Sequence, residues 1–402
     1  MTKLVLYAPI HSRSGYGDHA RESARALVKL NRWDVKILPC AWGNTPLSVS
    51  TPDLDPITIN QMTEQPDIWV MLTVPNEARA MGKHRNILWT AGMETTLISQ
   101  PWVEGCNRMD LVIATSEHSK KVIEATEWTS NQGHVSKVTK PVVSLFEGLD
   151  EDIWNPDMRY NKSGTISKLL KSVKSDFNFL FVGHWLKGDH RHDRKDVGGM
   201  LEAYKKAFSD MPSFTQPGLI MKTSGAGFSV TDRTNILNRI KSVVGDMPNI
   251  HLVHGELTVE EMRDLYLHPK VKASVSFTHG EGYGRPLQEA AACGLPVIAP
   301  NWSGQADFLQ GKHIPLAGKL ENVHDSAVWE NMILKESQWF YADVDFGAKV
   351  LKKVHKDYDR FEKKAKSLQK DILTNFTFSK MTEKLGEIMD QHAGVTVKKL
   401  KF

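Results

Sequence analysis

The sequence has few features typical of a membrane protein or of a protein from an oxidising compartment. No segment approaches the ~20 consecutive apolar residues that a membrane-spanning helix needs. The three cysteines, Cys40, Cys106 and Cys293, lie far apart, are odd in number and lack metal-ligand spacing. They predict reduced thiols and a cytoplasmic location. The N-terminal stretch MTKLVLYAPI has only a short apolar run, which predicts a first β-strand rather than a signal peptide.

Excess charge of either sign is also small. The formal net charge is +4, which allows an acidic partner without requiring one. Hydrophobic residues make up 41% and charged residues 24%, an ordinary balance for a globular protein. The 402 residues are enough for two domains, and no internal repeat or low-complexity tract interrupts them.

The most informative stretch spans residues 271–298. An apolar run leads into a loop with three glycines, a helix of mostly small residues is predicted from Pro286, and a second apolar run, LPVIAP, follows. The order strand, loop, helix, strand indicates an α/β unit. Glycines let the backbone approach a ligand closely, and the N–H groups that open a helix favour an anion.

Two glutamates in this stretch are separated by seven residues. Glu281 falls in the loop, and Glu289 falls about one turn inside the predicted helix. A carboxylate offers acceptors only, which suits the hydroxyl groups of a sugar or a ribose. Taken alone, two glutamates at this spacing would more readily be a helix-capping residue and a solvent-exposed helix residue than ligand-binding residues. The choice between these roles depends on the surrounding sequence.

The segment HGEGYGRPLQEAAACGLPV resembles the Glu-x7-Glu signature, EGFGxxxxEAMACGxPV, of retaining nucleotide-sugar glycosyltransferases of group 1 (family 4-like). The resemblance implies an α/β protein of GT-B architecture, with two Rossmann-like doubly wound domains and an interdomain cleft. In that family the first glutamate contacts the donor sugar, the second holds the ribose, and the glycine-rich loop contacts sugar and diphosphate. The resemblance assigns these donor-binding roles to Glu281, Glu289, Gly282, Tyr283, Gly284 and Arg285.

A second segment that resembles this family contains several basic residues. Residues 177–183 predict the strand that opens the second domain, after which relatives carry an arginine and then a lysine that pair with the donor diphosphate. His184 stands in the arginine's place, and Lys195 matches the lysine. Fixed cations would stabilise the negative charge that builds on the leaving diphosphate. The candidates for the missing arginine are Arg194, Arg191 and Lys187. The loop histidines lack a clean zinc-ligand pattern, so we expect no metal.

Three more residues of the second half are candidate donor contacts. Lys222 ends a predicted strand and could meet a phosphate, or it could extend along the surface into solvent. His254 and Leu257 lie in a segment that resembles the one whose backbone contacts the nucleobase in relatives. Thr258 and Glu261 predict a capping box at the start of the next helix.

The first half contributes two candidate segments. Gly15, Tyr16 and Gly17 follow the first predicted strand and precede a helix predicted over residues 19–30. Ligands are expected at such a loop in an α/β domain, and in relatives it touches donor phosphate or acceptor. Glu94 follows a predicted strand at residues 86–89, and the resemblance makes it a candidate for sugar or acceptor contact. Its alternative role is a carboxylate at a helix start. A donor-contacting histidine that many relatives carry in this region has no counterpart here.

The resemblance extends over nearly the whole chain and predicts its domains. We expect an N-terminal acceptor domain at residues 1–156, a lysine-rich linker at 157–176 and a nucleotide-sugar-binding domain at 177–375. Residues 376–402 should form a helix that returns to the first domain, followed by a basic tail. Helices are also predicted over residues 339–354 and 361–375.

The implied activity is retaining, metal-independent and cofactor-free glycosyl transfer from a nucleoside diphosphate sugar, most readily a UDP-sugar, to an acceptor hydroxyl. Glu281, Lys195 and Glu94 are the predicted catalytic residues. No group of residues resembles an activated nucleophile, which favours front-face substitution over a covalent intermediate. The acceptor stays open: a lipid, a polysaccharide, or a hydroxylated base in DNA, as in some bacteriophage transferases. A related epimerase or polymerase, and a catalytically silent binding protein, are the alternatives.

Overall fold

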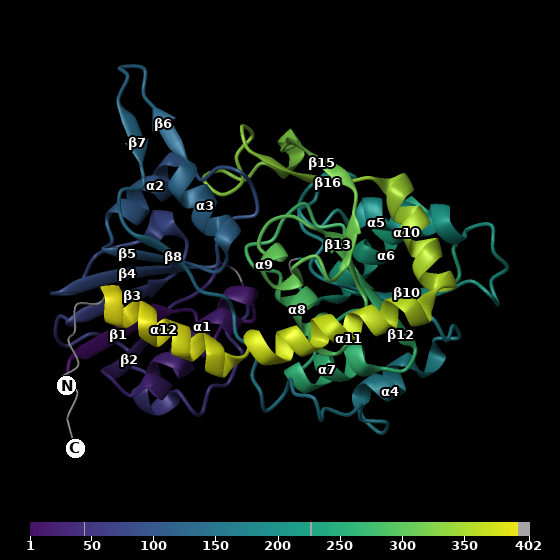
Figure 1. Ribbon diagram of the computed structural model, residues 1–402, viewed down its shortest axis with the longest axis horizontal. Coiled ribbons are helices and arrows are strands. Elements are labelled where there is room, and N and C mark those ends of the chain that lie inside the picture. The colour runs from purple at the N-terminus through teal and green to yellow at the C-terminus, as the bar shows by residue number, and fades with distance from the viewer. Residues whose placement is uncertain (44, 226, 393–402) are drawn as a thin grey trace. The chain divides into compact units, whose positions relative to one another are not determined.

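The computed structural model describes residues 1–43, 45–225 and 227–392 and divides into two compact units (Figure 1). Unit 1 contains the described parts of residues 1–93 and 97–148, and residues 376–392. Unit 2 contains residues 94–96 and 149–375. The predicted basic tail lies outside the described residues.

Unit 1 is built around a six-stranded parallel sheet in the order β2-β1-β3-β4-β5-β8. The strands are β1 (Lys3–Ala8), β2 (Asp34–Pro39), β3 (Ile68–Leu72), β4 (Arg85–Thr90), β5 (Leu111–Ala114) and β8 (Val142–Ser144). Every residue of β3 is buried, as expected for a parallel strand with both faces covered. The longer helices of the unit are α1 (Gly15–Leu30), α2 (Gln100–Asn107), α3 (Glu117–Ala125) and α12 (Phe378–His392).

The C-terminal helix α12 belongs to unit 1 although its sequence neighbours belong to unit 2. Its apolar side chains, among them Met381, Leu385 and Met389, are part of the same core as Leu4 and Leu6 of β1. Arg32, just beyond the end of α1, also binds α12, because its guanidinium donates to the carbonyl of Gly386 at 3.0 Å.

Unit 2 is built around a second six-stranded parallel sheet in the order β11-β10-β9-β12-β13-β14. Its strands are β9 (Asn178–Val182), β10 (Gly218–Lys222), β11 (Ile250–Val253), β12 (Val271–Val275), β13 (Val297–Pro300) and β14 (Ile314–Leu316). Its helices are α4 (Thr165–Leu169), α5 (Val197–Phe208), α6 (Val230–Val244), α7 (Val259–Leu267), α8 (Arg285–Ala292), α9 (Ala306–Leu309), α10 (Val344–Lys356) and α11 (Tyr358–Asn375). Renumbered within the sheet, the strand order is 3-2-1-4-5-6, the order of a Rossmann fold.

The helix predicted over residues 339–354 is wrong in its first part. Residues 338–342 form β16 (Gln338–Ala342), which pairs antiparallel with β15 (Gly318–Asn322), and α10 begins only after its N-cap Asp343. Trp339 and Tyr341 are two residues apart and both buried, the period of a strand rather than of a helix. They pack with Val323 and Ala327 in a small cluster of their own.

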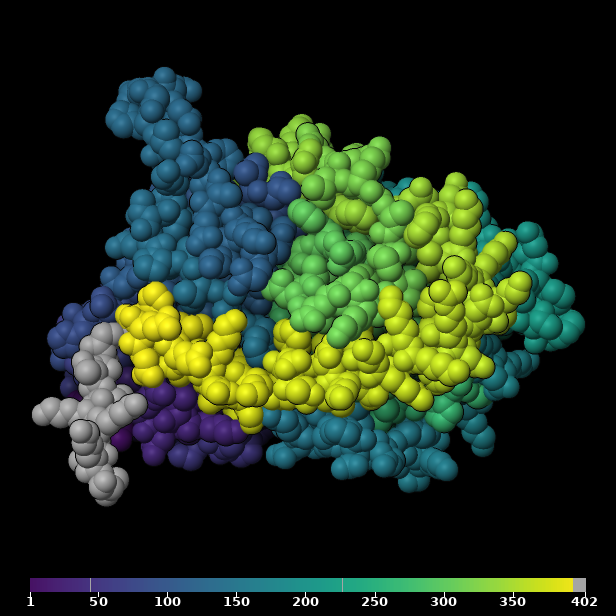
Figure 2. Space-filling view, viewed as in Figure 1, coloured from purple at the N-terminus to yellow at the C-terminus, as the bar shows by residue number. Residues whose placement is uncertain are grey.

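Two features of unit 1 also differ from the sequence-based expectations. Helix α1 begins at Gly15 rather than at residue 19, because the hydroxyl of Ser14 accepts from the N–H of Gly17 and caps the helix there. An unexpected antiparallel hairpin, β6 (Glu127–Thr129) and β7 (Val135–Lys137), projects from the rest of the unit (Figures 1 and 2).

Candidate functional site

The strand order of unit 2 reverses between β9 and β12. In open α/β sheets ligands bind beyond the carboxyl ends of the strands at such a switch point. The segments that leave these two ends are residues 183–196, after β9, and residues 276–284, after β12. They contain two of the three predicted catalytic residues, Glu281 and Lys195, and five of the predicted donor-binding residues.

The loop after β12 is held in place through its backbone. The N–H of Glu281 donates to the hydroxyl of Ser303 at 2.9 Å, and its carbonyl accepts from the N–H of Gly304 at 2.9 Å. Gly284 has φ +103°, a conformation that favours glycine, and it forms the N-cap of α8. Residues 282–284 therefore lead directly into the N-terminus of a helix, as an anion site requires.

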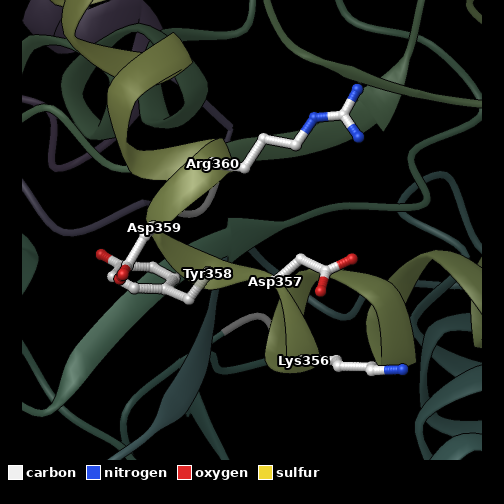
Figure 3. A pocket seen from close by; sticks show the side chains of 5 residues that line it. All are labelled: Lys356, Asp357, Tyr358, Asp359 and Arg360. Carbon is white, nitrogen blue, oxygen red and sulfur yellow. The ribbon is translucent and has the colours of Figure 1, made fainter.

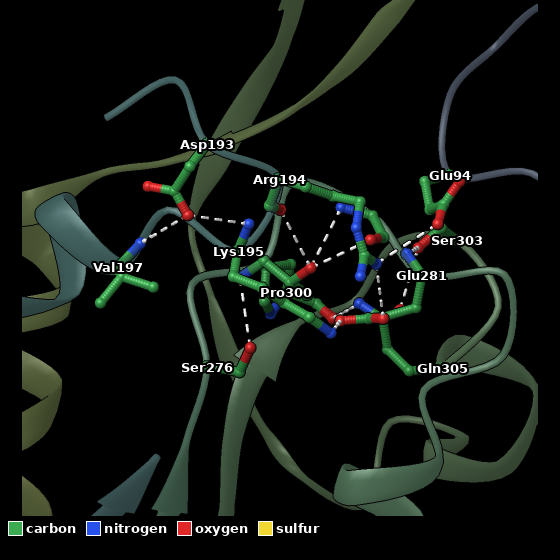
Figure 4. A network of polar contacts seen from close by, with 12 residues as sticks. Glu94, Asp193, Arg194, Lys195, Val197, Ser276, Glu281, Pro300, Ser303 and Gln305 are labelled. Carbon is green, nitrogen blue, oxygen red and sulfur yellow. Dashed lines mark hydrogen bonds and ion pairs between the residues drawn. The ribbon is translucent and has the colours of Figure 1, made fainter. Parts of the chain in front are cut away.

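Four charged side chains meet at this loop (Figure 4). The ammonium of Lys195 forms an ion pair with one oxygen of Glu281. Arg194 Nη1 lies 3.2 Å from the other oxygen of Glu281 and 3.3 Å from Oε1 of Glu94. The Glu281 side chain is only 8% exposed, so it is almost fully desolvated and depends on both cations for compensation. The structure thus brings the three predicted catalytic residues together with Arg194.

The charges of this cluster shift one another's proton affinities. Burial alone would raise the pKa of Glu281, but Lys195 and Arg194 outweigh burial and lower it. Glu94 has weaker compensation, and burial raises its pKa. Burial lowers the pKa of Lys195, against the attraction of Glu281. Glu281 is therefore the carboxylate that stays ionised most firmly.

Glu94 reaches the cluster because residues 94–96 are bound to β16. The N–H of Thr96 donates to the carbonyl of Gln338 at 3.0 Å, and the N–H of Gln338 donates to the Thr96 hydroxyl at 2.8 Å. Gly280 lies directly against this segment, since a Cβ built at position 280 would be 2.0 Å from the carbonyl oxygen of Glu94. Glu94 is not a helix N-cap, because α2 begins only at Gln100.

Glu289 lies one turn inside α8, as predicted. Its carboxylate contacts Arg285 Nε at 3.1 Å and accepts from the Tyr266 hydroxyl at 3.2 Å. The Glu289 side chain is 13% exposed. Arg285 is one of the predicted donor contacts, whereas Tyr266, which comes from α7, has no signal of its own in the sequence. Tyr283 is buried, and its hydroxyl accepts from the amide of Gln288 at 2.6 Å.

His184 and Lys222 lie at the ends of the neighbouring strands β9 and β10. Desolvation, together with the nearby charges of Lys195, Lys222 and Arg194, lowers the pKa of His184 to about 4. Burial also lowers the pKa of Lys222. His184 is therefore a neutral hydrogen-bonding group near three cations, with Nδ1 3.0 Å from the hydroxyl of Ser224.

Of the three candidates for the missing arginine, only Arg194 contacts Glu281. Arg191 instead donates to the carbonyl of Ala342 at 3.0 Å and lies 3.6 Å from Asp196. Lys187 is exposed and donates to the carbonyl of Val328 at 3.3 Å.

The predicted nucleobase segment begins directly after β11. His254 Nε2 lies 2.8 Å from Asp232 Oδ2, and its ring lies 6.0 Å from that of Phe228. Leu257 is half-buried in the loop that leads to α7. Thr258 and Glu261 form the predicted capping box at the start of that helix.

The first-loop candidates belong to unit 1 and form the first turn of α1. The Tyr16 ring stacks on Trp42 with centroids 3.8 Å apart, and its hydroxyl lies 3.1 Å from that of Thr90. Gly17 has no room for a side chain, because a Cβ would lie 2.0 Å from the carbonyl oxygen of Ser12. Gly15 has open space where a Cβ would project, among the described atoms.

A shallow depression elsewhere in unit 2 is lined by the consecutive residues Lys356–Arg360, between α10 and α11 (Figure 3). None of the predicted site residues lines it.

Within the described part of the chain, no cluster of three or more His, Cys, Asp or Glu side chains could hold a metal ion. In the same residues, no helix has the length and apolar character to cross a membrane.

Comparison with known proteins gives structural relatives only. No protein-family model matches the chain, and no curated protein matches it. A glycosyltransferase from Rickettsia africae ESF-5 aligns with a TM-score of 0.65 and 13% identity, over 98% of this chain and 100% of that one. HepE of Anabaena, in complex with UDP and glucose, aligns with a TM-score of 0.64 and 14% identity, over 97% and 100%. Sucrose-phosphate synthase from Thermosynechococcus elongatus aligns with a TM-score of 0.64 and 13% identity, over 97% and 99%.

The chain has the GT-B fold. This confirms the fold class expected from the sequence, with two parallel six-stranded sheets. Identities this low establish the fold alone, so activity and ligands have to be argued from the site.

Proposed function

We propose that the protein is a glycosyltransferase that takes a nucleoside diphosphate sugar as its donor. The observation that carries the proposal is the convergence of Lys195 and Arg194 on Glu281 at the switch point of a Rossmann-type sheet. Glu289 lies one turn into the helix that follows. UDP-sugars are the proposed donors, supported by the likeness to HepE, which is described in complexes with UDP-glucose and with UDP and glucose.

The donor would bind with its nucleotide toward Glu289 and its sugar toward Glu281. A carboxylate accepts hydrogen bonds from hydroxyl groups, so Glu289 suits the ribose and Glu281 suits the sugar. The diphosphate would then lie near Arg194, Lys195 and Lys222, with the N–H groups of Gly282–Gly284 as further donors. Lys222 is half-buried and close enough to His184 for its charge to lower the pKa of that ring, and its ammonium suits a phosphate oxygen as a partner.

The proposed reaction retains the anomeric configuration and needs no divalent metal. The bond between the sugar C1 and the phosphate oxygen breaks, and the acceptor oxygen bonds to C1 from the same face. The acceptor proton passes to the departing phosphate oxygen. Arg194 and Lys195 would stabilise the charge on the leaving diphosphate, which is the role that a metal ion has in other transferases. Glu281 is held between two cations, so it suits a binding role better than that of an attacking nucleophile.

The acceptor is proposed to be a hydroxyl group, with a hydroxylated base in DNA as one candidate and a glycan or a lipid as the others. The basic loop at residues 184–195 supports a polyanionic acceptor. A cytoplasmic location is supported by Cys40, Cys106 and Cys293, which are free thiols.

The test combines thermal-shift and hydrolysis measurements with UDP-, GDP- and ADP-sugars, each with and without EDTA. A ligand that binds only the native state must raise the melting temperature. A shift and hydrolysis with one donor, unchanged by EDTA, would support a metal-independent transferase. Acceptor panels of hydroxymethylated DNA, oligosaccharides and lipid vesicles would then identify the acceptor. No shift with any nucleotide sugar would overturn the proposal in favour of a silent binding protein.

A further inference from the structure

We propose that His279 is a positioning residue that fixes Arg194 and Lys195 relative to Glu281. The inference rests on the proposed transferase function and assigns a role to a buried side chain that would not touch the donor. His279 comes two residues before Glu281, and none of its side chain is exposed.

The backbone of His279 joins two segments of the site. Its N–H donates to the carbonyl of Arg194 at 2.9 Å, and its carbonyl accepts from the N–H of Phe340 in β16 at 2.9 Å. The hydroxyl of Thr278 contacts the same Arg194 carbonyl at 3.3 Å. The segment that carries the cations and the strand that holds residues 94–96 are therefore both bonded to one residue.

The imidazole nitrogens lie close to the same two segments. Nε2 lies 3.0 Å from the carbonyl oxygen of Arg191, and Nδ1 lies 2.6 Å from that of Phe340. The ring stacks on Trp339, with centroids 4.5 Å apart, and lies 4.3 Å from the ring of Tyr341. Both ring partners are carbonyl oxygens, and burial lowers the pKa of His279 to about 4, so the neutral ring has one N–H and donates to one of them at a time. The backbone N–H and carbonyl of His279 are bonded to Arg194 and Phe340 in either case.

His279 therefore positions the backbone that carries the two cations, Arg194 and Lys195. The carbonyl oxygens of Arg191 and Arg194 face His279. The side chains of Arg194 and of the next residue, Lys195, pair with Glu281. β16 in turn holds Thr96, two residues from Glu94. Because a displacement of about 1 Å in a reacting group can lower a rate about 100-fold, loosening this residue should reduce turnover without removing any group that binds the donor.

Three substitutions separate the two ring contacts. In His279→Asn the amide nitrogen replaces Nδ1 and can still donate to Phe340. In His279→Gln the amide reaches the place of Nε2 and can still donate to Arg191. His279→Phe keeps the stacking on Trp339 and loses both contacts. We expect kcat to fall by about 100-fold for Phe and Asn and by about 10-fold or less for Gln, with the donor KM changing less than about 3-fold in all three.

His313 provides the matched control. It is also a buried histidine of unit 2, burial lowers its pKa to about 4 as it does that of His279, and it follows α9 in the sequence, outside the three segments above. His313→Gln and His313→Phe should lower the melting temperature as much as the His279 variants and leave kcat within about 2-fold of wild type.

The measurements are donor hydrolysis or transfer, UDP affinity and melting temperature for all variants. A higher kcat in the Gln variant than in the Asn variant at equal melting temperature supports the inference. If kcat follows melting temperature across both histidines, or if Asn and Gln are equal, His279 is only structural and the inference is overturned. An inactive wild-type protein that binds no UDP would instead refute the proposed function.

Discussion

Gly280 lies so close to Glu94 that a Cβ at position 280 would stand 2.0 Å from the Glu94 carbonyl oxygen. The two residues are far apart in sequence, and the absence of a side chain at one of them lets the other reach Arg194. The glycine before the glutamate is therefore required by the close approach of a second segment as well as by loop flexibility.

Gly280→Ala should displace residues 94–96 and lower transferase activity at least 10-fold, because backbone atoms cannot move aside as a flexible side chain can. The measurement is kcat with the identified donor, together with the melting temperature. Gly164→Ala is the control, since the nearest atom to its Cβ would be Nδ2 of the Asn161 side chain, at 3.0 Å, and the nearest backbone atom would be 3.4 Å away. Full activity in Gly280→Ala would show that the contact with Glu94 is dispensable.

The two cations at Glu281 should contribute more to turnover than the other basic residues of the same loop. Lys195→Gln and Arg194→Gln should each lower kcat by about 100- to 1,000-fold, because each removes a preorganised charge from the leaving diphosphate. Lys187→Gln should change kcat less than about 2-fold, since Lys187 is exposed and its one hydrogen bond within the described part of the chain is to the carbonyl of Val328. Steady-state kinetics of the three variants decides the point, and a large effect at Lys187 would contradict the assignment of Arg194.

The sequence predicted the parallel strands and the glycine loop well because their signals are local. The apolar run predicted as a strand at residues 177–183, which ends at a glycine, became β9 to within one residue at each end. β16 was mistaken for helix because its partner β15 is polar and exposed, so nothing local revealed the pairing. The start of α1 was missed because glycine is a poor helix former, and only the Ser14 cap explains a helix beginning at Gly15.

The predicted site residues could be named from the sequence, but their partners could not. Glu94, Lys195 and Glu281 were all candidates, and the structure brings them into one cluster. The choice among Lys187, Arg191 and Arg194 needed coordinates, because consecutive loop residues point in directions that no periodicity determines. His279 and Ser303 were missed as parts of the site for a similar reason: their contacts are with main-chain groups, which leave no pattern in the sequence.

The two glutamates of the Glu-x7-Glu signature should separate binding from turnover. Glu289→Gln should weaken UDP affinity by about 10-fold, because a neutral amide is a poorer acceptor for ribose hydroxyls. Glu281→Gln should leave UDP affinity within about 3-fold and lower kcat by about 100-fold, because its proposed contact is with the sugar. Calorimetric titration with UDP and steady-state kinetics measure the two effects. Tyr266→Phe is the control for disturbance of the Glu289 surroundings, since it keeps both glutamates and removes only the hydroxyl that donates to Glu289. Equal loss of UDP affinity in both glutamate variants would contradict the proposed donor orientation.

Asp196 should make the stability of the protein depend on pH. Its side chain caps α5 by accepting from the N–H of Gly199 at 2.9 Å, while Arg191 lies 3.6 Å from the second oxygen, too far for a hydrogen bond. Burial raises the pKa of Asp196 to about 7, from 3.8 for an ordinary aspartate. Between these values the folded state binds a proton that the unfolded state has released, so this contribution to stability is complete below pH 3.8 and is lost as the pH rises through 7.

Asp196→Asn removes this titration and keeps the cap, because an amide oxygen can accept from Gly199 and asparagine tolerates the left-handed φ of 42° at this position. The melting temperature of the variant, relative to wild type, should therefore rise by at least about 2 °C between pH 5 and pH 8. Scanning calorimetry of both proteins across that range tests the expectation, and Asp343→Asn, at the exposed N-cap of α10, is the control that should show no such trend. A difference between Asp196→Asn and wild type that stays constant with pH would mean that Asp196 is already ionised in the folded protein at pH 5.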